Sequence, residues 1–114
     1  MLNPDITIKR GDHGKVVAGQ FLDSHGAPVP LPGSITRKLF MRGYSTNVIK
    51  INGANFIFLD AEVGTWSYTM TPEDVDTSGV YKIEFEVTRP GIVDTFPTDP
   101  ENPYLIVLIQ DDMG

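Results

Sequence analysis

The sequence contains no cysteine, which excludes disulfide bridges, thiolate zinc sites and cysteine nucleophiles. No apolar run reaches the ~18–20 residues that a membrane helix needs. The first residues, Met-Leu-Asn-Pro-Asp, lack the charged and apolar regions of a signal peptide. We therefore expect no membrane partner, and synthesis in the cytoplasm.

Basic residues are also scarce. Nine lysines and arginines stand against 15 aspartates and glutamates, and the formal net charge is −6. An acidic surface repels phosphate backbones, so we do not expect nucleic acid as a partner. Two short basic groups, within residues 9–15 and 37–42, are too sparse to change that balance and are expected to be solvated.

Helical periodicity, internal repeats and heptads are absent as well, whereas glycine and proline are plentiful, at 11 and 9 residues. Between them lie short alternating segments. In the clearest, residues 81–88, Tyr81, Ile83, Phe85 and Val87 alternate with polar residues, which predicts one buried and one wet strand face. The expected strands are residues 5–9, 16–22, 35–42, 48–51, 56–59, 65–70, 81–88 and 104–109.

These segments predict an all-β fold, an immunoglobulin-like antiparallel β-sandwich of about seven or eight strands in a single domain over residues 1–114. The Asn52-Gly53 pair between two apolar runs indicates a hairpin that joins 48–51 to 56–59. Residues 71–76 are expected to form one helical turn, with Thr71 as N-cap and Pro72 at its first position.

The last strand, 104–109, is apolar on both faces. Either it is central and covered on both sides, or its second face meets another subunit. The second reading makes Tyr104, Ile106 and Leu108 interface candidates, and Tyr44 and Phe96, from expected connections, join them.

The run Thr77-Ser-Gly-Val-Tyr-Lys-Ile resembles the corner that leads into the sixth strand of immunoglobulin domains. The resemblance implies that Tyr81 is the corner tyrosine, whose hydroxyl bonds to nearby backbone, with Gly79 and Asp76 forming the turn. Ile83 stands where those domains carry a cysteine. Trp66 is too close to Tyr81 to be their core tryptophan.

A second resemblance covers most of the chain. The motifs are Ile-Thr-Ile-Lys-Arg-Gly-Asp, Gly-Ala-Pro-Val-Pro-Leu-Pro-Gly, Phe-Met-Arg, Gly-Thr-Trp-Ser-Tyr, Asp-Thr-Ser-Gly-Val-Tyr, Glu-Phe-Glu-Val and Thr-Phe-Pro, in that order. Their order is similar to that in the N-terminal domain family of the phage baseplate upper protein and in related phage tail proteins.

That resemblance implies a non-enzymatic structural protein of a bacteriophage virion, in the tail or baseplate. Such a protein docks to neighbouring virion proteins and helps to attach host-recognition parts. The expected partners are other virion proteins, copies of the chain and a host surface glycan. The expected location is the virion, after synthesis in the bacterial cytoplasm. We expect no further domain of this kind within the sequence, so its station in the particle stays open.

Three alternatives remain. One is a capsid decoration or head–tail junction protein of the same fold. Another is a carbohydrate-binding module that uses Trp66, Tyr68 or Tyr44. An enzyme is least favoured, because His13 and His25 lie in turns beside Asp12 and Asp23, whereas a nucleophile and its base converge from separate segments.

Acidic residues gather in two loops. Asp74 and Asp76, with Glu73 alongside, lack the glycine and the distal glutamate of a calcium loop, so Asp76 is expected to form a turn. Asp94, Asp99 and Glu101 make the second loop. We expect no metal and no cofactor in either, although metal binding by Asp74 and Asp76 stays open.

Overall fold

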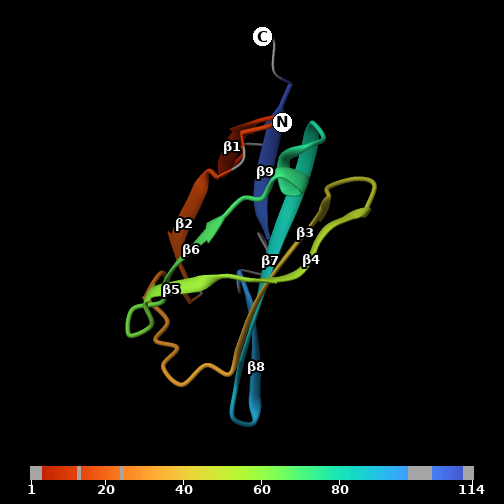
Figure 1. Cartoon of the computed structure of the whole chain (residues 1–114). Coiled ribbons are helices and arrows are strands. Elements are labelled where there is room, and N and C mark those ends of the chain that lie inside the picture. The colour runs from red at the N-terminus through yellow and green to blue at the C-terminus, as the bar shows by residue number, and fades with distance from the viewer. Residues whose placement is uncertain (1–3, 13, 24, 98–103, 112–114) are drawn as a thin grey trace.

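The computed structural model describes residues 4–12, 14–23, 25–97 and 104–111 (Figure 1). Its strands form two sheets of six and three strands, with the core between them. The expected all-β immunoglobulin-like sandwich is confirmed. The elements in chain order are β1 (Ile6–Lys9), β2 (Val16–Gln20), β3 (Thr36–Gly43), β4 (Ile49–Asn55), β5 (Ile57–Asp60), β6 (Thr65–Thr69), the 3₁₀ helix η1 (Pro72–Val75), β7 (Gly79–Arg89), β8 (Ile92–Phe96) and β9 (Leu105–Gln110).

The order of strands is that of an immunoglobulin domain, except for the place of β1 and the addition of β8. The larger sheet runs β1-β9-β7-β3-β4, with β8 also paired to β7, and the smaller runs β2-β6-β5. These correspond to the immunoglobulin sheets G-F-C-C′ and B-E-D. One pair departs from the antiparallel expectation, because β1 runs parallel to β9.

The long strand β7 is the centre of the larger sheet. It pairs with β3 on one side and, along successive stretches, with β9 and β8 on the other. Tyr81, Ile83, Phe85 and Val87 are all buried, as their alternation predicted. These four side chains belong to the single buried cluster between the sheets.

Aromatic rings fill the middle of the sandwich. Phe21, just after β2, stacks on Phe96 of β8 with ring centroids 4.4 Å apart, and it meets Phe85 edge-on at 5.1 Å. Trp66 of the smaller sheet lies 4.6 Å from Phe85. Gly19 on β2 leaves the room for the indole, since a Cβ there would lie 2.9 Å from Trp66 Cζ2.

The helix η1 closes the end of the sandwich where β7 begins. Thr71 precedes it as the N-cap and Pro72 opens it, as the sequence predicted, and the helix is a short 3₁₀ turn. Val75 is completely buried, and its carbonyl accepts a hydrogen bond from Gly11 at 2.8 Å.

No helix in the described residues is long and apolar enough to cross a membrane.

The expected Asn52-Gly53 hairpin is wrong. Gly53 has a positive φ of 81°, but β4 continues past it to Asn55, paired with β3 through two register shifts. Phe56 then enters the core, and β5 joins the other sheet by pairing with β6. The chain changes sheets here because burying the Phe56 ring between the layers draws the backbone across the sandwich.

Strand β8 was not expected from the sequence, which indicated an irregular connection after Arg89. Pro90 and Gly91 instead make a tight turn, and β8 pairs back onto β7 from Arg89↔Ile92 to Phe85↔Phe96. In Figure 1 this hairpin extends beyond the smaller sheet, at the bottom of the view. Its tip exposes Ile92 and Val93.

Candidate interaction surface

The outward face of the larger sheet carries most of the predicted interface residues. The register places Leu108 of β9 opposite Val80 of β7, and Ile106 opposite Lys82. The amide of Tyr44 donates a hydrogen bond to the carbonyl of Val80 at 2.9 Å, which sets Tyr44 in the same row. We call this set the aromatic patch. It consists of Tyr44, Val80, Lys82, Tyr104, Ile106 and Leu108.

A lysine between two tyrosines lies at the centre of the aromatic patch. The rings of Tyr44 and Tyr104 meet edge to face, with centroids 5.8 Å apart. The Lys82 Nζ lies 5.7 Å from the first centroid and 5.2 Å from the second, within range of cation–π attraction. The neighbouring Tyr44 hydroxyl raises the pKa of the Tyr104 phenol above its ordinary value, so the Tyr104 phenol is neutral near pH 7.

A shallow pocket of about 150 Å³ adjoins the aromatic patch. Its floor and rim come from β3, β4 and β7, with Phe40 and Ile49 as apolar walls and Asn52 at the edge. An exposed ion pair crosses it, in which Arg42 Nη2 donates to Glu84 Oε1 at 2.8 Å. The aromatic patch and the pocket together offer rings, apolar surface and fixed charges to a partner.

Two of the predicted interface residues need correction. Phe96 is buried in the core, 3% exposed, because β8 pairs with β7 and turns the ring onto Phe21. Ile106 points outward but is 9% exposed, so its neighbours on the sheet cover most of it. Tyr44, Tyr104 and Leu108 are half-buried and remain available to a partner.

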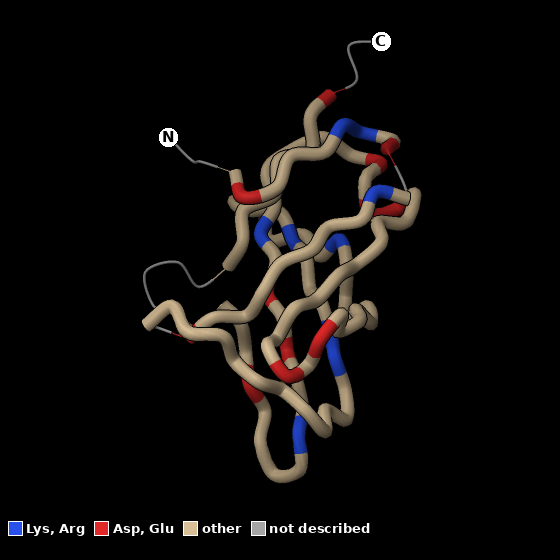
Figure 2. The backbone as a smooth tube through the Cα atoms, turned by 90° about the vertical axis from the view of Figure 1, so that its left-hand side faces the viewer, with Lys and Arg blue, Asp and Glu red and all other residues tan. Residues whose placement is uncertain are grey.

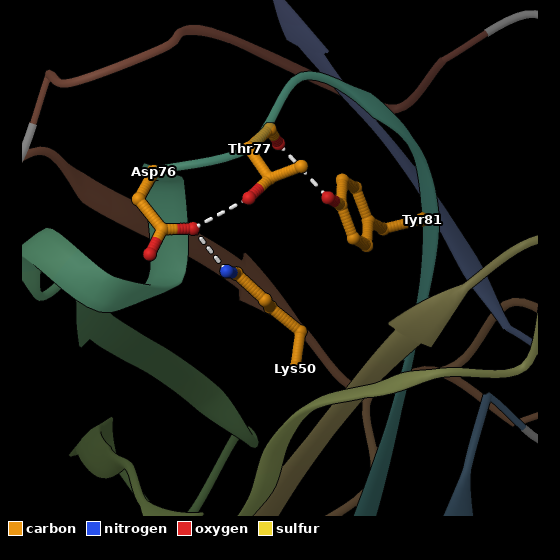
Figure 3. A network of polar contacts seen from close by, with 4 residues as sticks. All are labelled: Lys50, Asp76, Thr77 and Tyr81. Atoms are coloured by element: carbon orange, nitrogen blue, oxygen red, sulfur yellow. Dashed lines mark hydrogen bonds and ion pairs between the residues drawn. The ribbon is translucent and has the colours of Figure 1, made fainter.

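The predicted corner lies at the start of β7 (Figure 3). The Tyr81 hydroxyl donates a hydrogen bond to the carbonyl of Thr77 at 2.8 Å. Gly79 has a φ of 148°, a conformation that side chains rarely adopt, and an added Cβ would lie 3.6 Å from the Tyr81 ring. The geometry is that of an immunoglobulin tyrosine corner.

Asp76 ties this corner to β4. Its Oδ1 accepts hydrogen bonds from Lys50 Nζ and, at 2.8 Å, from Thr77 Oγ1. The Lys50 bond is the main reason that the pKa of Asp76 lies below the ordinary value, and the Thr77 bond adds to it. Asp76 is therefore ionised over the physiological range.

Asp74 points away from Asp76, into the sandwich. Its Oδ2 accepts a hydrogen bond from the Tyr68 hydroxyl at 2.7 Å and from the Thr71 amide at 2.9 Å. Burial first, and then Asp74, raise the pKa of the Tyr68 phenol. The two carboxylates thus serve different contacts, and the described residues hold no group of three or more potential metal-ligating side chains.

The other titratable candidates are dispersed. His25 is exposed in a turn where Asp23 Oδ1 accepts its backbone amide at 2.8 Å and that of Ala27 at 3.0 Å. Asp94 is paired with Arg89 at 2.8 Å. The predictions for His13, Asp99 and Glu101 fall outside the described residues.

The alternative of a sugar platform on β6 is contradicted. Trp66 is 2% exposed and Tyr68 is 8% exposed, because β6 turns both rings toward the larger sheet. Neither ring offers a face to a sugar. Of the three aromatics proposed for that role, Tyr44 is left, and Lys82 lies over its ring.

Sequence reasoning missed the two lysines that organise these surfaces. Lys82 looked like an ordinary wet-face residue, yet it bridges two rings that are 60 positions apart in the chain, Tyr44 and Tyr104. Lys50 gave no signal toward Asp76. Only the register of β7 against β3 and β9 brings the Lys82 partners together. The alternation of residues 81–88 predicted that Lys82 faces outward, but it could not indicate these partners.

Neither a protein-family model nor a curated protein matches this chain. The resemblance to phage baseplate proteins, which rests on short motifs, therefore stays a prediction.

Proposed function

We propose that this chain is a non-enzymatic structural protein of a bacteriophage virion, a tail or baseplate component that docks to neighbouring virion proteins. The order of short motifs along the sequence supports the phage assignment. The observation that carries the docking role is the aromatic patch, where tyrosines and aliphatic side chains gather on the outward face of the two central strands β7 and β9.

The composition of the aromatic patch suits a protein contact. Tyrosine and arginine are the residue types that dominate binding energy at interfaces, where they sit in packed and desolvated centres. Tyr44 and Tyr104 hold each other in place and lie beside the pocket of Phe40 and Arg42. Their order before binding reduces the entropy that a partner must overcome.

The arrangement favours a protein partner over a sugar. A sugar ring stacks on a free aromatic face, and Lys82 Nζ lies over the rings of both Tyr44 and Tyr104. A protein partner can instead pair with Lys82 and cover the rings from the side. Host glycan binding then belongs to the parts that this chain helps to attach.

Repeated weak contacts would hold the chain in the particle. A patch of this size gives modest affinity alone, but copies arranged around a symmetric tail multiply it. A capsid decoration or head–tail junction protein would be held by the same kind of repeated contacts. The position of the chain in the particle distinguishes that alternative from a tail component.

The test is incorporation into particles. Phage particles made in a host that expresses wild-type chain are purified and analysed by peptide mass spectrometry and cryo-electron microscopy. We expect stoichiometric incorporation, with density for the aromatic patch against a neighbouring tail protein. Val80→Glu, which places a charge between Leu108 and Tyr44 in the patch, should reduce incorporation at least tenfold. Leu59→Glu, which replaces an exposed aliphatic residue of the other sheet, is the control and should incorporate normally.

Two results would overturn the proposal. The first is a chain that stays in the soluble fraction while complete particles form without it. The second is a glycan-array signal that disappears in Tyr44→Ala while incorporation is unaffected, which would favour the carbohydrate-binding alternative.

A further inference from the structure

Strand β2 has a free edge. It pairs with β6 in regular antiparallel register over all five residues, from Val16↔Thr69 to Gln20↔Thr65, and no strand in the described ranges pairs with its other side. In immunoglobulin domains of the ABED type, the first strand covers this edge. Here the first strand, β1, joins β9 of the opposite sheet instead.

The ladder shows which backbone groups face outward. Met70 donates to the carbonyl of Lys15, and Phe21 donates to the carbonyl of Gly64. Bonding alternates along an antiparallel strand, so Val17 and Gly19 bond to β6, between those two points. The amides and carbonyls of Val16, Ala18 and Gln20 therefore point away from the sheet, toward the free edge.

The other edges carry features that discourage pairing, and β2 does not. Edge strands avoid association through charges, bulges and short length. Strand β4 has two register shifts, and β5 has one together with Asp60. Strand β1 has four residues and ends in Lys9, and β8 carries Asp94. Strand β2, with the sequence Val-Val-Ala-Gly-Gln, has no charge, no proline and no bulge.

The outward face of the smaller sheet carries one charged residue of its strands, Asp60 of the far strand β5, which lies opposite Thr65, whereas β2 contributes none. Figure 2, turned toward this side of the molecule, shows long tan stretches crossing the front, interrupted by short red segments near the centre. Val16, Ile57 and Leu59 are more than half exposed on this face. The residues of this face are Val16, Ala18, Gln20, Ile57, Leu59, Asp60, Thr65, Ser67 and Thr69. A chain of net charge −6 repels its own copies least where its surface carries no charge, as it does along β2.

We propose that β2 is the contact through which two copies of this chain associate, by antiparallel pairing of β2 with β2 of the second copy. The register that uses every outward group is centred on Ala18. It sets Ala18 opposite Ala18 of the second copy and Val16 opposite Gln20, with each pair exchanging two backbone hydrogen bonds. The two smaller sheets become one continuous sheet.

A second copy fits this edge better than an unrelated strand does. Antiparallel pairing of identical strands is isologous, so every residue meets its symmetry mate and closure comes without a further contact. The small side chain at Ala18 lets the strands approach on the symmetry axis, and no charge meets its like there. The contact is independent of the virion assignment, since it forms between copies of one chain.

Amide exchange gives the direct test on the wild-type protein. Hydrogen exchange is followed by NMR at increasing protein concentration, together with sedimentation equilibrium. In the monomer, the amides of Val17 and Gly19 are protected by β6, and those of Val16, Ala18 and Gln20 exchange quickly. On association, we expect protection of these three amides to rise at least tenfold in step with the dimer fraction. A protein that remains monomeric at millimolar concentration, or a dimer in which Ala18 still exchanges quickly, overturns the proposal.

A pair of variants separates this edge from the rest of the face. Ala18→Lys places two positive charges against each other on the symmetry axis, and like charges on opposed residues destabilise a pair. We expect its dimer dissociation constant to rise at least tenfold. Ile57→Lys puts the same charge on the same face but on the far strand β5, and it should dimerise as wild type does. Both positions are exposed, so circular dichroism should show unchanged folding; equal dimerisation of Ala18→Lys and wild type contradicts the proposal.

Discussion

The two halves of the core are closed by different chemistry. Around the second half of β7, Phe85 lies among Phe21, Trp66 and Phe56, with centroids 4.6 to 5.2 Å away. Around the start of β7, two tyrosines reach polar groups at the rim of the sandwich, Tyr81 at Thr77 and Tyr68 at Asp74. The same class of side chain thus fills volume in one half and closes the end of the fold in the other.

The difference reflects how far each ring lies from water. In the middle of the sandwich there is nothing polar to bind, so burial and ring geometry supply the stabilisation. At the corner, the backbone of η1 and its flanks presents carbonyls and amides that need partners. A tyrosine satisfies both demands because its ring packs inward while its hydroxyl remains at the boundary.

The largest expected effect is in the ring-filled half. Phe21→Ala removes a side chain that touches both sheets, and it should lower the free energy of unfolding by about 3–5 kcal/mol. Chemical denaturation followed by tryptophan fluorescence measures this loss. Phe58→Ala, at a half-buried ring of the same cluster, is the control and should lose less. Equal losses at the two positions would show that Phe21 is not central.

The next largest loss of stability is expected at Asp74, in the half of the core that is closed by polar contacts. Asp74→Ala leaves the Tyr68 hydroxyl and the Thr71 amide without their acceptor, which costs about 1–3 kcal/mol for buried groups. Glu73→Ala changes an exposed acid of the same turn and should stay within about 0.5 kcal/mol of wild type. Calorimetry compares the melting temperatures of the two variants. If Asp74→Ala melts at the wild-type temperature, the hydrogen bonds of Asp74 do not stabilise this end of the sandwich.

A smaller effect is expected at the corner hydrogen bond. Tyr81→Phe keeps the ring and removes the bond to the Thr77 carbonyl, so about 0.5–1.5 kcal/mol should be lost. Tyr81→Ala also removes the buried ring, and its loss should approach that of Phe21→Ala, at about 3–5 kcal/mol. If the two substitutions cost the same in urea titrations, the hydroxyl rather than the ring holds the corner.

The smallest effect concerns the exposed pair of Lys50 and Asp76 and depends on pH. The pKa of Asp76 is lower in the folded protein than the ordinary 3.8, so folding favours its ionised form. This contribution is complete above the unfolded-state pKa and disappears as the pH falls through the lower folded-state value. Below about pH 4, wild type should therefore lose stability more steeply than Asp76→Asn. Lys50→Met should fall between wild type and Asp76→Asn, because the Thr77 hydrogen bond still lowers the pKa of Asp76. Parallel acid profiles for all three proteins would exclude the pair as a contributor.

Most strands could be predicted because their residues alternate locally. The segment 81–88 predicted β7 to within two residues at its start and one at its end, and the glycine–tyrosine spacing indicated the corner before any partner was known. The failures came where local signals compete with burial. Asn52 and Gly53 are ideal turn residues, yet β4 runs through them because Phe56 is drawn into the core.

The candidate surface was predicted only in part. The double apolar character of 104–109 pointed to Tyr104 and Leu108, and both lie on the outward face. Phe96 could not be placed without knowing that β8 pairs with β7, because pairing decides which way a ring faces. Lys82 has no sequence signature, because its ring partners are remote in the chain. The free edge of β2 has none either, because it depends on which strands the described residues place beside β2.

By itself, the sequence determined the class of fold, the inward face of β7 and the absence of cysteine chemistry, because alternation, turn residues and composition are local properties. Only the tertiary structure decided which sheet each strand joins, that β1 leaves β2 uncovered, and that Tyr44 meets Tyr104 across Lys82. These depend on pairings between distant segments, and the burial of a few aromatic rings selects one set of pairings from several that the same strands allow.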